Sequence, residues 1–505
     1  MNQSEKKWLI VAGLVCLIYA ALRFWNLTAS CLWFDEIFSL HAAGRDWQGL
    51  FGFVAQDLIH PPLFYVLLKL WVGVTGGETL FWLRLFPVFF SLLALAPFIL
   101  LCRELRLSPA TVALALTFFA VNGSLIKYAQ EIRMYSLLLF FALVSYWLFA
   151  RFLNSGKGLI FLLIANVLLV YTHYFGWFVV FSEACAVAVL QREKLKHILF
   201  VSGAVFLSFT PWIYALRQAA KINADVGQNI GWMRKPDLRA ILQFVYDLFE
   251  PVYFQQSNAD VRAILLLTVP IILVGGVAFV FRLANLKNES REEKRNFILL
   301  VIFTAAPLLL AFAASWISPY SIWGTRHLII VFAPFAILLA DAFSKINVSQ
   351  LRMPALGLVF LLIGGAFVLQ ARQPQPNFIW CAWENLALDL RPEKQARIYV
   401  FEDLIAYHFW FALRGADADF EVIKINGIEG LNEDKAYFLP RGFDEVKTAG
   451  ENDIAGERFF IAFRDKDWNA AKPPLKNLTE KGYRIGEPRA FEAQGLKAFL
   501  VEIRK

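Results

Sequence analysis

Long apolar stretches separated by short charged loops fill roughly the first 370 residues of the chain. A membrane-spanning helix needs about 20 predominantly apolar residues, and the pattern predicts eleven such spans. They lie at residues 8–27, 80–101 and 110–125, in a stretch that ends at Arg151, in a pair that meets at residues 171–174, at 198–216 and 261–282, and in three stretches that end before Tyr320, at Lys345 and near residue 369.

Residues 63–74 are also apolar, but they number only about a dozen, which is short for a span. Pro61 and Pro62 stand just before them, and proline is favoured at the start of a helix. We therefore expect a helix that lies in the membrane interface rather than across the bilayer.

The loop charges predict the direction in which the spans run. Lys6 and Lys7 precede the first span, and every loop predicted to share their side carries at least two Lys or Arg residues. Cytoplasmic loops are enriched in these residues. If residues 63–74 crossed the membrane, every later loop would change sides and the bias would be lost. The pattern predicts a cytoplasmic N-terminus and a C-terminus outside.

The composition changes after Arg372, where the sequence QPQP at 373–376 is typical of a linker. Strands are predicted at 397–401, 420–425, 436–439, 459–463 and 497–503, and a helix at 403–413. We expect a membrane domain at 1–372 and a small extracytoplasmic α/β domain at 373–505. The second domain has no G-x-G-x-x-G and no metal-ligand spacing, so the sequence assigns it no chemistry.

Composition supports a polytopic helical membrane protein, since 58% of residues are hydrophobic and only 18% are charged. The formal charge of +8 does not indicate nucleic-acid binding, because the basic residues are spread over short loops instead of forming a stripe. None of the five cysteines has the C-x-x-C spacing of a metal site. Cys31 and Cys381 fall on the same predicted outer side, where an oxidising compartment would allow a disulfide between them.

An acidic pair, Asp35 and Glu36, lies among apolar residues in the first outer loop (LWFDEIF, residues 32–38). One interpretation is structural, because acids often cap the start of a helix. The other is catalytic, because a low-dielectric setting raises a carboxyl pKa toward the range that a general base needs.

A second constellation lies in the predicted outer loop 127–135, which contains Lys127, Glu131, Arg133 and Tyr135. An arginine near a membrane surface is often an interfacial anchor. A guanidinium beside an acid and a phenol also suits a phosphate-bearing ligand. The sequence leaves both interpretations open.

Two further sites share this ambiguity. His60 is either a loop residue in a turn or a ligand for phosphate or metal, and Arg326 and His327 are either anchors or lipid-phosphate contacts. Glu183, inside the sixth span, is a functional candidate because intramembrane acids are costly. A partner such as His173 would make its role structural instead.

Five short motifs occur in order: WFDE at 33–36, HPPLFY at 60–65, RLFP at 84–87, AQEIRMY at 129–135 and YTHYFG at 171–176. Together with the topology they resemble the GT-C membrane glycosyltransferases. The likeness is greatest to the bacterial branch related to protein O-mannosyltransferases and lipid A aminoarabinose transferases. It covers residues 1–370 and is densest in the first 180, whereas the C-terminal part is only generically similar to the extracytoplasmic domains of such proteins.

The resemblance implies an inverting transfer of a sugar from a polyprenyl-phosphate donor, at the outer face of the bacterial inner membrane. The acceptor would be a lipid, a glycan or a protein. The family's first-loop acid corresponds to Asp35, with Glu36 beside it, and its second-loop acid corresponds to Glu131. The two acids are expected to face each other across a cavity. Phosphate contacts are expected from the residues Arg133, Tyr135, His60, Lys127, Arg326 and His327.

Some GT-C enzymes use a divalent metal and others do not. This chain has no D-x-D in either loop, so we expect no obligatory metal, and a divalent metal remains an open possibility. Trp33 and Trp232 could stack on the sugar or prenyl group. The alternative function is a transporter or flippase for lipid-linked sugars, but transporters place their polar groups near the bilayer midplane, and here the acids cluster in outer loops.

Overall fold

The computed structural model describes residues 3–76, 79–222, 230–254, 257–346, 349–375, 377–414, 419–426, 439, 443, 445–464, 471–493 and 495–505. The chain forms two compact units. Unit 1 comprises Met1–Leu27, His60–Gln218 and Met233–Pro374, and unit 2 comprises Thr28–Ile59, Ala219–Trp232 and Gln375–Lys505. Each unit is described by itself below.

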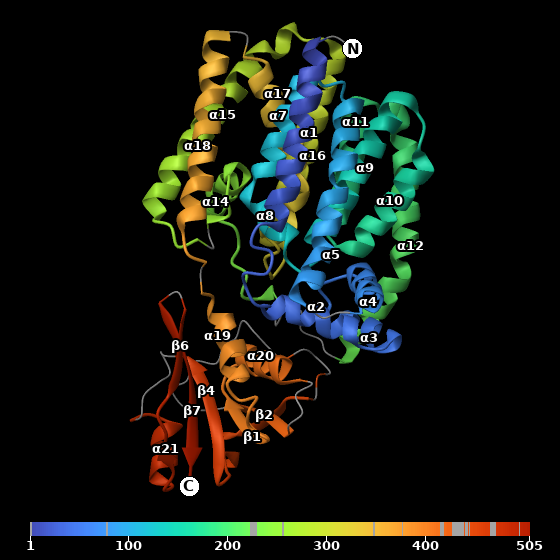
Figure 1. Cartoon of the computed structure of the whole chain (residues 1–505). Helices are drawn as coiled ribbons and strands as arrows, with labels where there is room; N and C mark the ends of the chain where they lie inside the picture. Colours follow the sequence, from blue (N-terminus) through green and yellow to red (C-terminus); the bar gives the residue numbers. More distant parts are fainter. Residues whose placement is uncertain are drawn as a thin grey trace. The chain divides into compact units, whose positions relative to one another are not determined.

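Unit 1 is a helical bundle (Figure 1). Its helices are α1 (Gln3–Phe24), α4 (Leu63–Thr75), α5 (Leu80–Leu93), α6 (Leu95–Glu104), α7 (Pro109–Val121), α8 (Gly123–Ala129), α9 (Tyr135–Ser155), α10 (Leu159–Thr172), α11 (Gly176–Leu190), most of α12 (Leu195–Ile222), α14 (Leu238–Phe249), α15 (Val261–Asn285), α16 (Arg291–Ile317), α17 (Phe332–Ser344) and α18 (Ser349–Arg372). The 3-10 helices η1 (Arg192–Lys194), η3 (Leu286–Asn288) and η4 (His327–Val331) join some of them.

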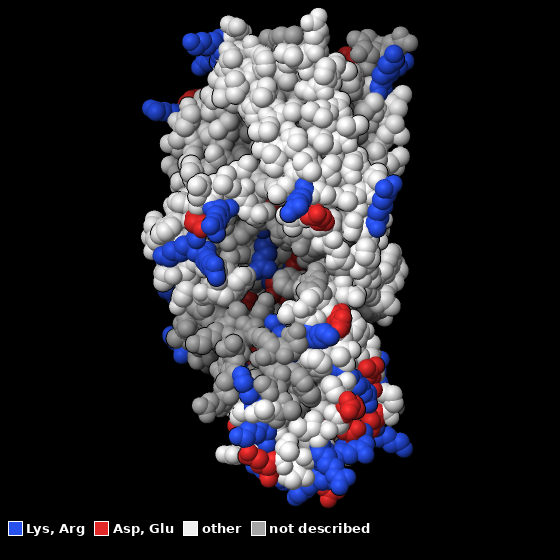
Figure 2. Space-filling view, turned by 90° about the vertical axis from the view of Figure 1, so that its left-hand side faces the viewer, with Lys and Arg blue, Asp and Glu red and all other residues white. Residues whose placement is uncertain are grey.

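Within the described residues, eight helices are long and apolar enough to cross a membrane. A ninth candidate is the pair α7 and α8, which is bent by 61° at its junction. Helices α10 and α11, the predicted tight pair, have 14 and 15 residues, and α4 is a short helix of 13 residues. In Figure 2 wide areas of the helical unit carry no charged residue. The protein is therefore a multi-pass membrane protein, as predicted.

The bend between α7 and α8 is fixed by contacts with residues 247–253. The Asn122 side chain accepts a hydrogen bond from Leu125 N and donates to the carbonyl of Asp247 at 2.9 Å. Gly123 N donates to the carbonyl of Glu250 at 2.8 Å. A Cβ at position 123 would lie 2.3 Å from the backbone nitrogen of Tyr253, so only glycine fits there.

Arg23 compensates for the interruption of α7. Its fully buried guanidinium donates to the carbonyls of Phe119 and Ala120 in the last turn of α7. These carbonyls have no partner inside the helix because the helix ends there. The aromatic ring of Tyr19 lies against the same guanidinium. An arginine in the first span is thus a structural link between α1 and α7.

Unit 2 contains a seven-stranded sheet with strand order β3-β2-β1-β4-β7-β5, and β6 also pairs with β7. Its elements are β1 (Gln395–Val400), β2 (Asp419–Asn426), β3 (Lys447–Gly450), β4 (Arg458–Arg464), β5 (Arg484–Ile485), β6 (Arg489–Ala493) and β7 (Leu496–Arg504), with helices α19 (Ile379–Leu388), α20 (Asp403–Leu413) and α21 (Leu475–Glu480) and the 3-10 helix η5 (Glu451–Asp453). Strands β1–β4 pair in parallel and β7 is antiparallel to its neighbours. Figure 2 shows many charges of both signs on this region.

The predicted small α/β region is confirmed, and four of its five predicted strands are present. The fifth, at 436–439, falls on residues of which only Leu439 is described. The sequence pattern did not predict β3, β5, β6, α19 or α21. The proposed domain boundary at 372/373 stays a prediction.

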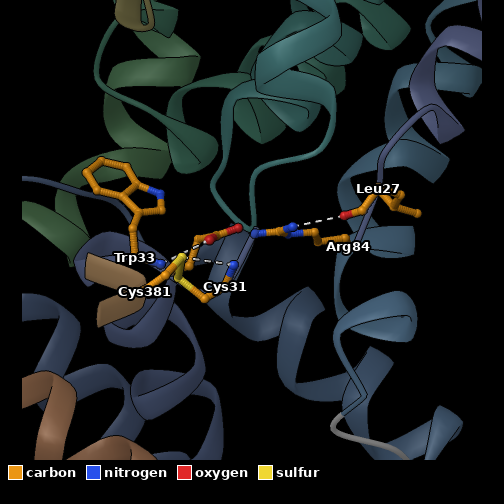
Figure 3. Close-up of a disulfide and its surroundings, with 6 residues drawn as sticks. Leu27, Cys31, Trp33, Arg84 and Cys381 are labelled. Carbon is orange, nitrogen blue, oxygen red and sulfur yellow. Dashed lines mark hydrogen bonds between the residues drawn. A yellow bond between two sulfur atoms is a disulfide. The ribbon is translucent and has the colours of Figure 1, made fainter. Parts of the chain in front are cut away.

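Segment Thr28–Ile59 belongs to unit 2, where it forms α2 (Phe34–Gly44) and α3 (Trp47–Asp57). A disulfide joins Cys31 to Cys381, and Cys31 N also donates to the sulfur of Cys381 at 3.4 Å (Figure 3). His41 in α2 hydrogen-bonds the hydroxyl of Tyr407 in α20 at 2.8 Å. The first loop is therefore bound covalently and by packing to the C-terminal part of the chain.

Candidate functional site

The acidic pair occupies the first turn of α2, and its two members have different surroundings. Glu36 is 1% exposed, and its Oε2 accepts a hydrogen bond from the backbone N–H of Trp33 at 3.2 Å. It therefore fulfils the structural role of a helix cap. Asp35 is partly exposed. Only Asp35 is thus both accessible and placed at the positive end of a helix dipole.

Arg133 is the centre of a polar cluster in unit 1. It is 3% exposed and lies in the short loop between α8 and α9. Its Nη1 donates to the hydroxyl of Tyr65 at 3.3 Å, and its Nη2 donates to Nε2 of His60 at 3.2 Å. Two segments that are distant in sequence, residues 60–65 and the loop after α8, therefore meet around one buried guanidinium.

His173 and His327 extend this cluster. The ring centroids of His60 and His173 are 5.7 Å apart, and those of His173 and His327 are 5.3 Å apart. His173 follows α10, and His327 begins η4. Tyr135, at the start of α9, has its ring 6.4 Å from that of His327. We call the residues His60, Tyr65, Arg133, His173 and His327 the arginine cluster.

The hydrogen bonds fix which nitrogens of two histidines carry protons. Nε2 of His60 accepts from Arg133, so the His60 proton is on Nδ1. Nδ1 of His173 accepts from the backbone N–H of Phe175 at 3.1 Å, so the His173 proton is on Nε2. That Nε2 atom is buried and has no hydrogen-bond partner among the described residues.

The charges around His173 keep it neutral. Burial lowers the pKa of His173 well below its usual value, and the nearby groups His60, Arg133 and Arg326 lower this pKa further. Arg133 and Arg326 both lie close enough to His173 for their charges to act on it. A buried N–H donor beside two guanidinium groups is suited to an anionic ligand.

Glu131 and Lys127 pair with each other. Lys127 Nζ lies 3.5 Å from Oε2 of Glu131, one helical turn along the chain. Glu131 is buried. Lys127 lies in α8, six residues before Arg133, and Glu131 lies in the same loop as Arg133, two residues before it.

Two acids that the sequence analysis did not single out lie nearby in unit 1. Asp247 accepts hydrogen bonds from Thr325 at 2.6 Å and from Gln243 at 2.7 Å. Glu250 is fully buried and accepts from the backbone N–H of Phe254 at 2.6 Å. Burial raises the pKa of Glu250 well above its usual value, and Asp247 raises it further. Through the hydrogen bond from Thr325, Asp247 holds the residue that directly precedes Arg326.

The predicted site residues are therefore distributed over both units. Unit 1 holds Glu131, Arg133, Tyr135, His60, Lys127, Arg326 and His327, whereas Asp35 and Glu36 belong to unit 2. The cluster unites His60, Arg133 and His327. That Asp35 and Glu131 face one another stays a prediction.

The expectation that no metal is obligatory also stays a prediction. Among the described residues, no group of three or more His, Cys, Asp or Glu side chains is arranged to hold a metal ion. Two imidazole lone pairs of the arginine cluster already accept hydrogen bonds, which explains why three close histidines do not form such a group.

Glu183 has a satisfied structural environment. Its Oε1 accepts from the Ser145 hydroxyl at 2.6 Å, and its Oε2 accepts from the Asn166 amide at 2.7 Å. The three residues belong to α9, α10 and α11. His173, the partner proposed from the sequence, contacts His60 and His327 instead, so this pairing is corrected.

Sequence reasoning did not assign Tyr65 or His173 to the site. Both residues occur in the motifs HPPLFY and YTHYFG, which it did recognise. The signal was thus available, but the role of each residue depends on a tertiary contact with Arg133 or His60.

The sequence matches no protein-family model and no curated protein. Solved structures do match. ArnT from Cupriavidus metallidurans bound to undecaprenyl phosphate gives a TM-score of 0.59 at 11% identity, covering 98% of each chain. Its apo state gives 0.57 at 12% identity, covering 99% of this chain and 98% of that one.

The archaeal oligosaccharyltransferase AglB from Archaeoglobus fulgidus, in complex with an inhibitory peptide and a dolichol-phosphate, gives a TM-score of 0.51 at 14% identity. That match covers 83% of this chain but only 65% of AglB, so this chain spans less than two thirds of the archaeal enzyme. ArnT, an aminoarabinose transferase, and AglB both belong to the GT-C superfamily. The chain therefore has the fold of the GT-C membrane glycosyltransferases, as its ordered motifs predicted.

Proposed function

We propose that this protein transfers a sugar from a polyprenyl-phosphate donor to an acceptor, with inversion, at the outer face of the bacterial inner membrane. The observation that carries the proposal is the arginine cluster. A buried Arg133, a second guanidinium at Arg326 and the unpartnered N–H of His173 form a site for a phosphate in a dry environment.

The chemistry of such a transfer needs little from a general acid, because a lipid phosphate is already a good leaving group. The bond between the anomeric carbon and the phosphate oxygen breaks, and its electron pair stays on that oxygen. Arg133 and His173 would stabilise the charge that develops there. Their fixed positions reduce the reorganisation that solvent would otherwise require.

The acceptor hydroxyl must attack from the opposite side of the sugar and lose a proton. Asp35 is our candidate base, because it is the accessible member of the acidic pair while Glu36 caps α2. The proton would pass from the acceptor oxygen to the Asp35 carboxylate as the new bond to the anomeric carbon forms. Glu131, held by Lys127, would orient the acceptor or the sugar.

The fold neighbours support this proposal. One ArnT structure is bound to undecaprenyl phosphate, and the AglB complex contains a dolichol-phosphate and a peptide. We propose by analogy a lipid-linked donor for this chain and a lipid, glycan or protein acceptor. The disulfide between Cys31 and Cys381 supports an oxidising compartment for unit 2, and hence a periplasmic C-terminal domain.

The test is transfer of a radiolabelled sugar from polyprenyl phosphate to candidate acceptors by the purified full-length protein in detergent. We expect Arg133→Gln to lower kcat by roughly a hundredfold, as for the loss of one charge-stabilising donor. Arg151→Gln, an exposed arginine at the end of α9, is the matched control and should behave as wild type. Equal transfer by both variants contradicts the proposed phosphate site.

The same protein reconstituted in vesicles tests the transporter alternative. Movement of the labelled donor across the bilayer without any transfer to an acceptor would contradict a glycosyltransferase and favour a flippase.

A further inference from the structure

Unit 1 contains a cavity at the far end of the helical stretch His327–Ser344 from the arginine cluster. It has a volume of about 730 Å³ and is lined by parts of α1, α7, α15, α16, α17 and α18 and by the loop between α6 and α7. The helical stretch His327–Ser344 begins at the arginine cluster and ends at this cavity. Its 18 residues correspond to about 27 Å of helix, which is close to the thickness of a bilayer's hydrocarbon core.

The lining of the cavity is divided between charged and apolar side chains. Six charged residues contribute to it: Arg106, Arg282, Glu293, Asp341, Lys345 and Arg352. The apolar part includes Trp8, Leu356 and Phe360. Trp8 is 40% and Phe360 is 43% exposed, so apolar surface continues from the cavity toward the outside of the bundle.

Most of these charges neutralise each other. Arg282 pairs with Glu289 and Asp341, and Lys345 pairs with Glu289 and Glu293, at distances of 2.5–3.0 Å. Each carboxylate of this network has a cationic partner inside the network, so these charges need no ligand to balance them.

The two remaining arginines differ from that network. Arg106 pairs with Glu292 and has a largely exposed side chain. Arg352 donates one long hydrogen bond, 3.5 Å, to the carbonyl of Ser344, and no described carboxylate pairs with it. The first turns of α18 therefore present an uncompensated guanidinium to the cavity, next to the apolar side chains of the same helix.

We propose that this cavity binds an anionic phospholipid of the bilayer. Its headgroup phosphate would contact Arg352, and its acyl chains would follow Trp8, Leu356 and Phe360. A guanidinium binds a phosphate in a bidentate manner, and basic pockets between membrane helices are suited to anionic headgroups. The volume falls within the range of ordinary ligand pockets. The lipid would hold together the ends of α1, α17 and α18.

The experiment is native mass spectrometry of the purified full-length protein with added phosphatidylglycerol or phosphatidylcholine of equal chain length. We expect wild type to retain phosphatidylglycerol in preference to phosphatidylcholine. We expect Arg352→Gln to weaken phosphatidylglycerol binding by about fivefold, the effect of one basic residue near an anionic headgroup. Arg151→Gln should leave this binding unchanged.

A second variant tests the cavity without removing a charge. Ala110→Phe would place an aromatic ring in the cavity, and we expect it to weaken binding while its melting temperature stays that of wild type. Equal binding of the two lipids, or unchanged binding in both variants, would overturn the proposal. Displacement by an equal concentration of glycerol 3-phosphate would overturn it as well, because the site would then recognise a free anion.

Discussion

Arg133 donates a hydrogen bond from Nη2 to Nε2 of His60 at 3.2 Å, and the same guanidinium reaches the hydroxyl of Tyr65. His60 therefore positions the guanidinium through a lone pair. The proposed phosphate site therefore depends on the acceptor atom Nε2 of His60.

This relationship predicts the effect of substitutions at His60. His60→Phe removes the acceptor, so Arg133 loses its orientation, and we expect kcat for sugar transfer to fall roughly a hundredfold. His60→Gln supplies a carbonyl oxygen that can accept from Arg133, and we expect it to keep most of the activity. If both variants lose activity equally, His60 does more than position Arg133.

Substitution of Asp35 is predicted to lower activity, whereas substitution of Glu36 is predicted to lower stability. Asp35→Asn should lower kcat at least a hundredfold, because general-base catalysis contributes about that much, while the melting temperature stays unchanged. Glu36→Ala removes the acceptor for Trp33 N–H and should cost about 1 kcal/mol of stability. Steady-state kinetics and thermal unfolding of both variants provide the measurement. Full activity of Asp35→Asn would remove the proposed base.

The disulfide between Cys31 and Cys381 predicts a redox-dependent stability of unit 2. We expect reduction, or the double variant Cys31→Ser and Cys381→Ser, to destabilise the protein by about 2–4 kcal/mol. Limited proteolysis should then cut within residues 28–59 first. The double variant is its own control, because a reductant should have no further effect on it.

The buried His41 is expected to make the folded protein less stable in acid. Burial, together with the charges of Arg45 and Arg414, lowers the pKa of His41 to about 3. Its Nε2 accepts from Arg45 at 3.2 Å, so a proton there would face a guanidinium. The unfolded chain takes up a proton near pH 6.5 whereas the folded protein does not. The contribution of neutral His41 to the free energy of unfolding is therefore complete above pH 6.5, and it decreases as the pH falls from 6.5 toward 3.

The expected loss between pH 7 and pH 5 is about 2 kcal/mol from His41 alone. Thermal unfolding of the detergent-purified protein at the two pH values measures it. His41→Gln can still hydrogen-bond Tyr407 but does not titrate, so its melting temperature should change less between pH 7 and pH 5. The same pH dependence in both proteins would contradict this assignment.

Substitutions of Glu183 distinguish a transferase from a transporter. Glu183→Gln keeps an acceptor for Ser145, and we expect transfer activity close to that of wild type. Glu183→Ala leaves the buried amide N–H of Asn166 without its acceptor, at a cost of about 1–3 kcal/mol, while the Ser145 hydroxyl can still donate to the amide oxygen of Asn166. A large loss of activity in Glu183→Gln at unchanged stability would indicate that this acid takes part in function.

Much of the fold could be predicted from the sequence, because long apolar segments have few structural alternatives. The predicted spans each coincide with a helix or a helix pair. The bend at Gly123 could not be predicted, since it depends on the backbone of residues 250–253 approaching from elsewhere in the chain. The minor strands β3, β5 and β6 are short or lie at the sheet's margins, where hydrophobic alternation is weak.

The site was only partly predictable for a related reason. Glu131, Arg133 and Tyr135 stand within five residues, so their proximity is local. Tyr65 and His173 reach Arg133 and His60 only through packing. The partners of Glu183 were in principle visible, because Ser145 and Asn166 are polar residues inside neighbouring apolar segments.

Gly123 has a consequence for how this protein can vary. The backbone at Gly123 lies so close to the backbone of residues 252 and 253 that a methyl group has no space between them. The two backbone segments can therefore be displaced only together. The first residue of α8 is hydrogen-bonded to Glu250 at the end of α14, and the same helix carries Lys127, which pairs with Glu131. A directed-evolution library that lengthens or reshapes the 250–254 loop would thus also shift the position of Glu131. Such libraries should therefore vary both segments together.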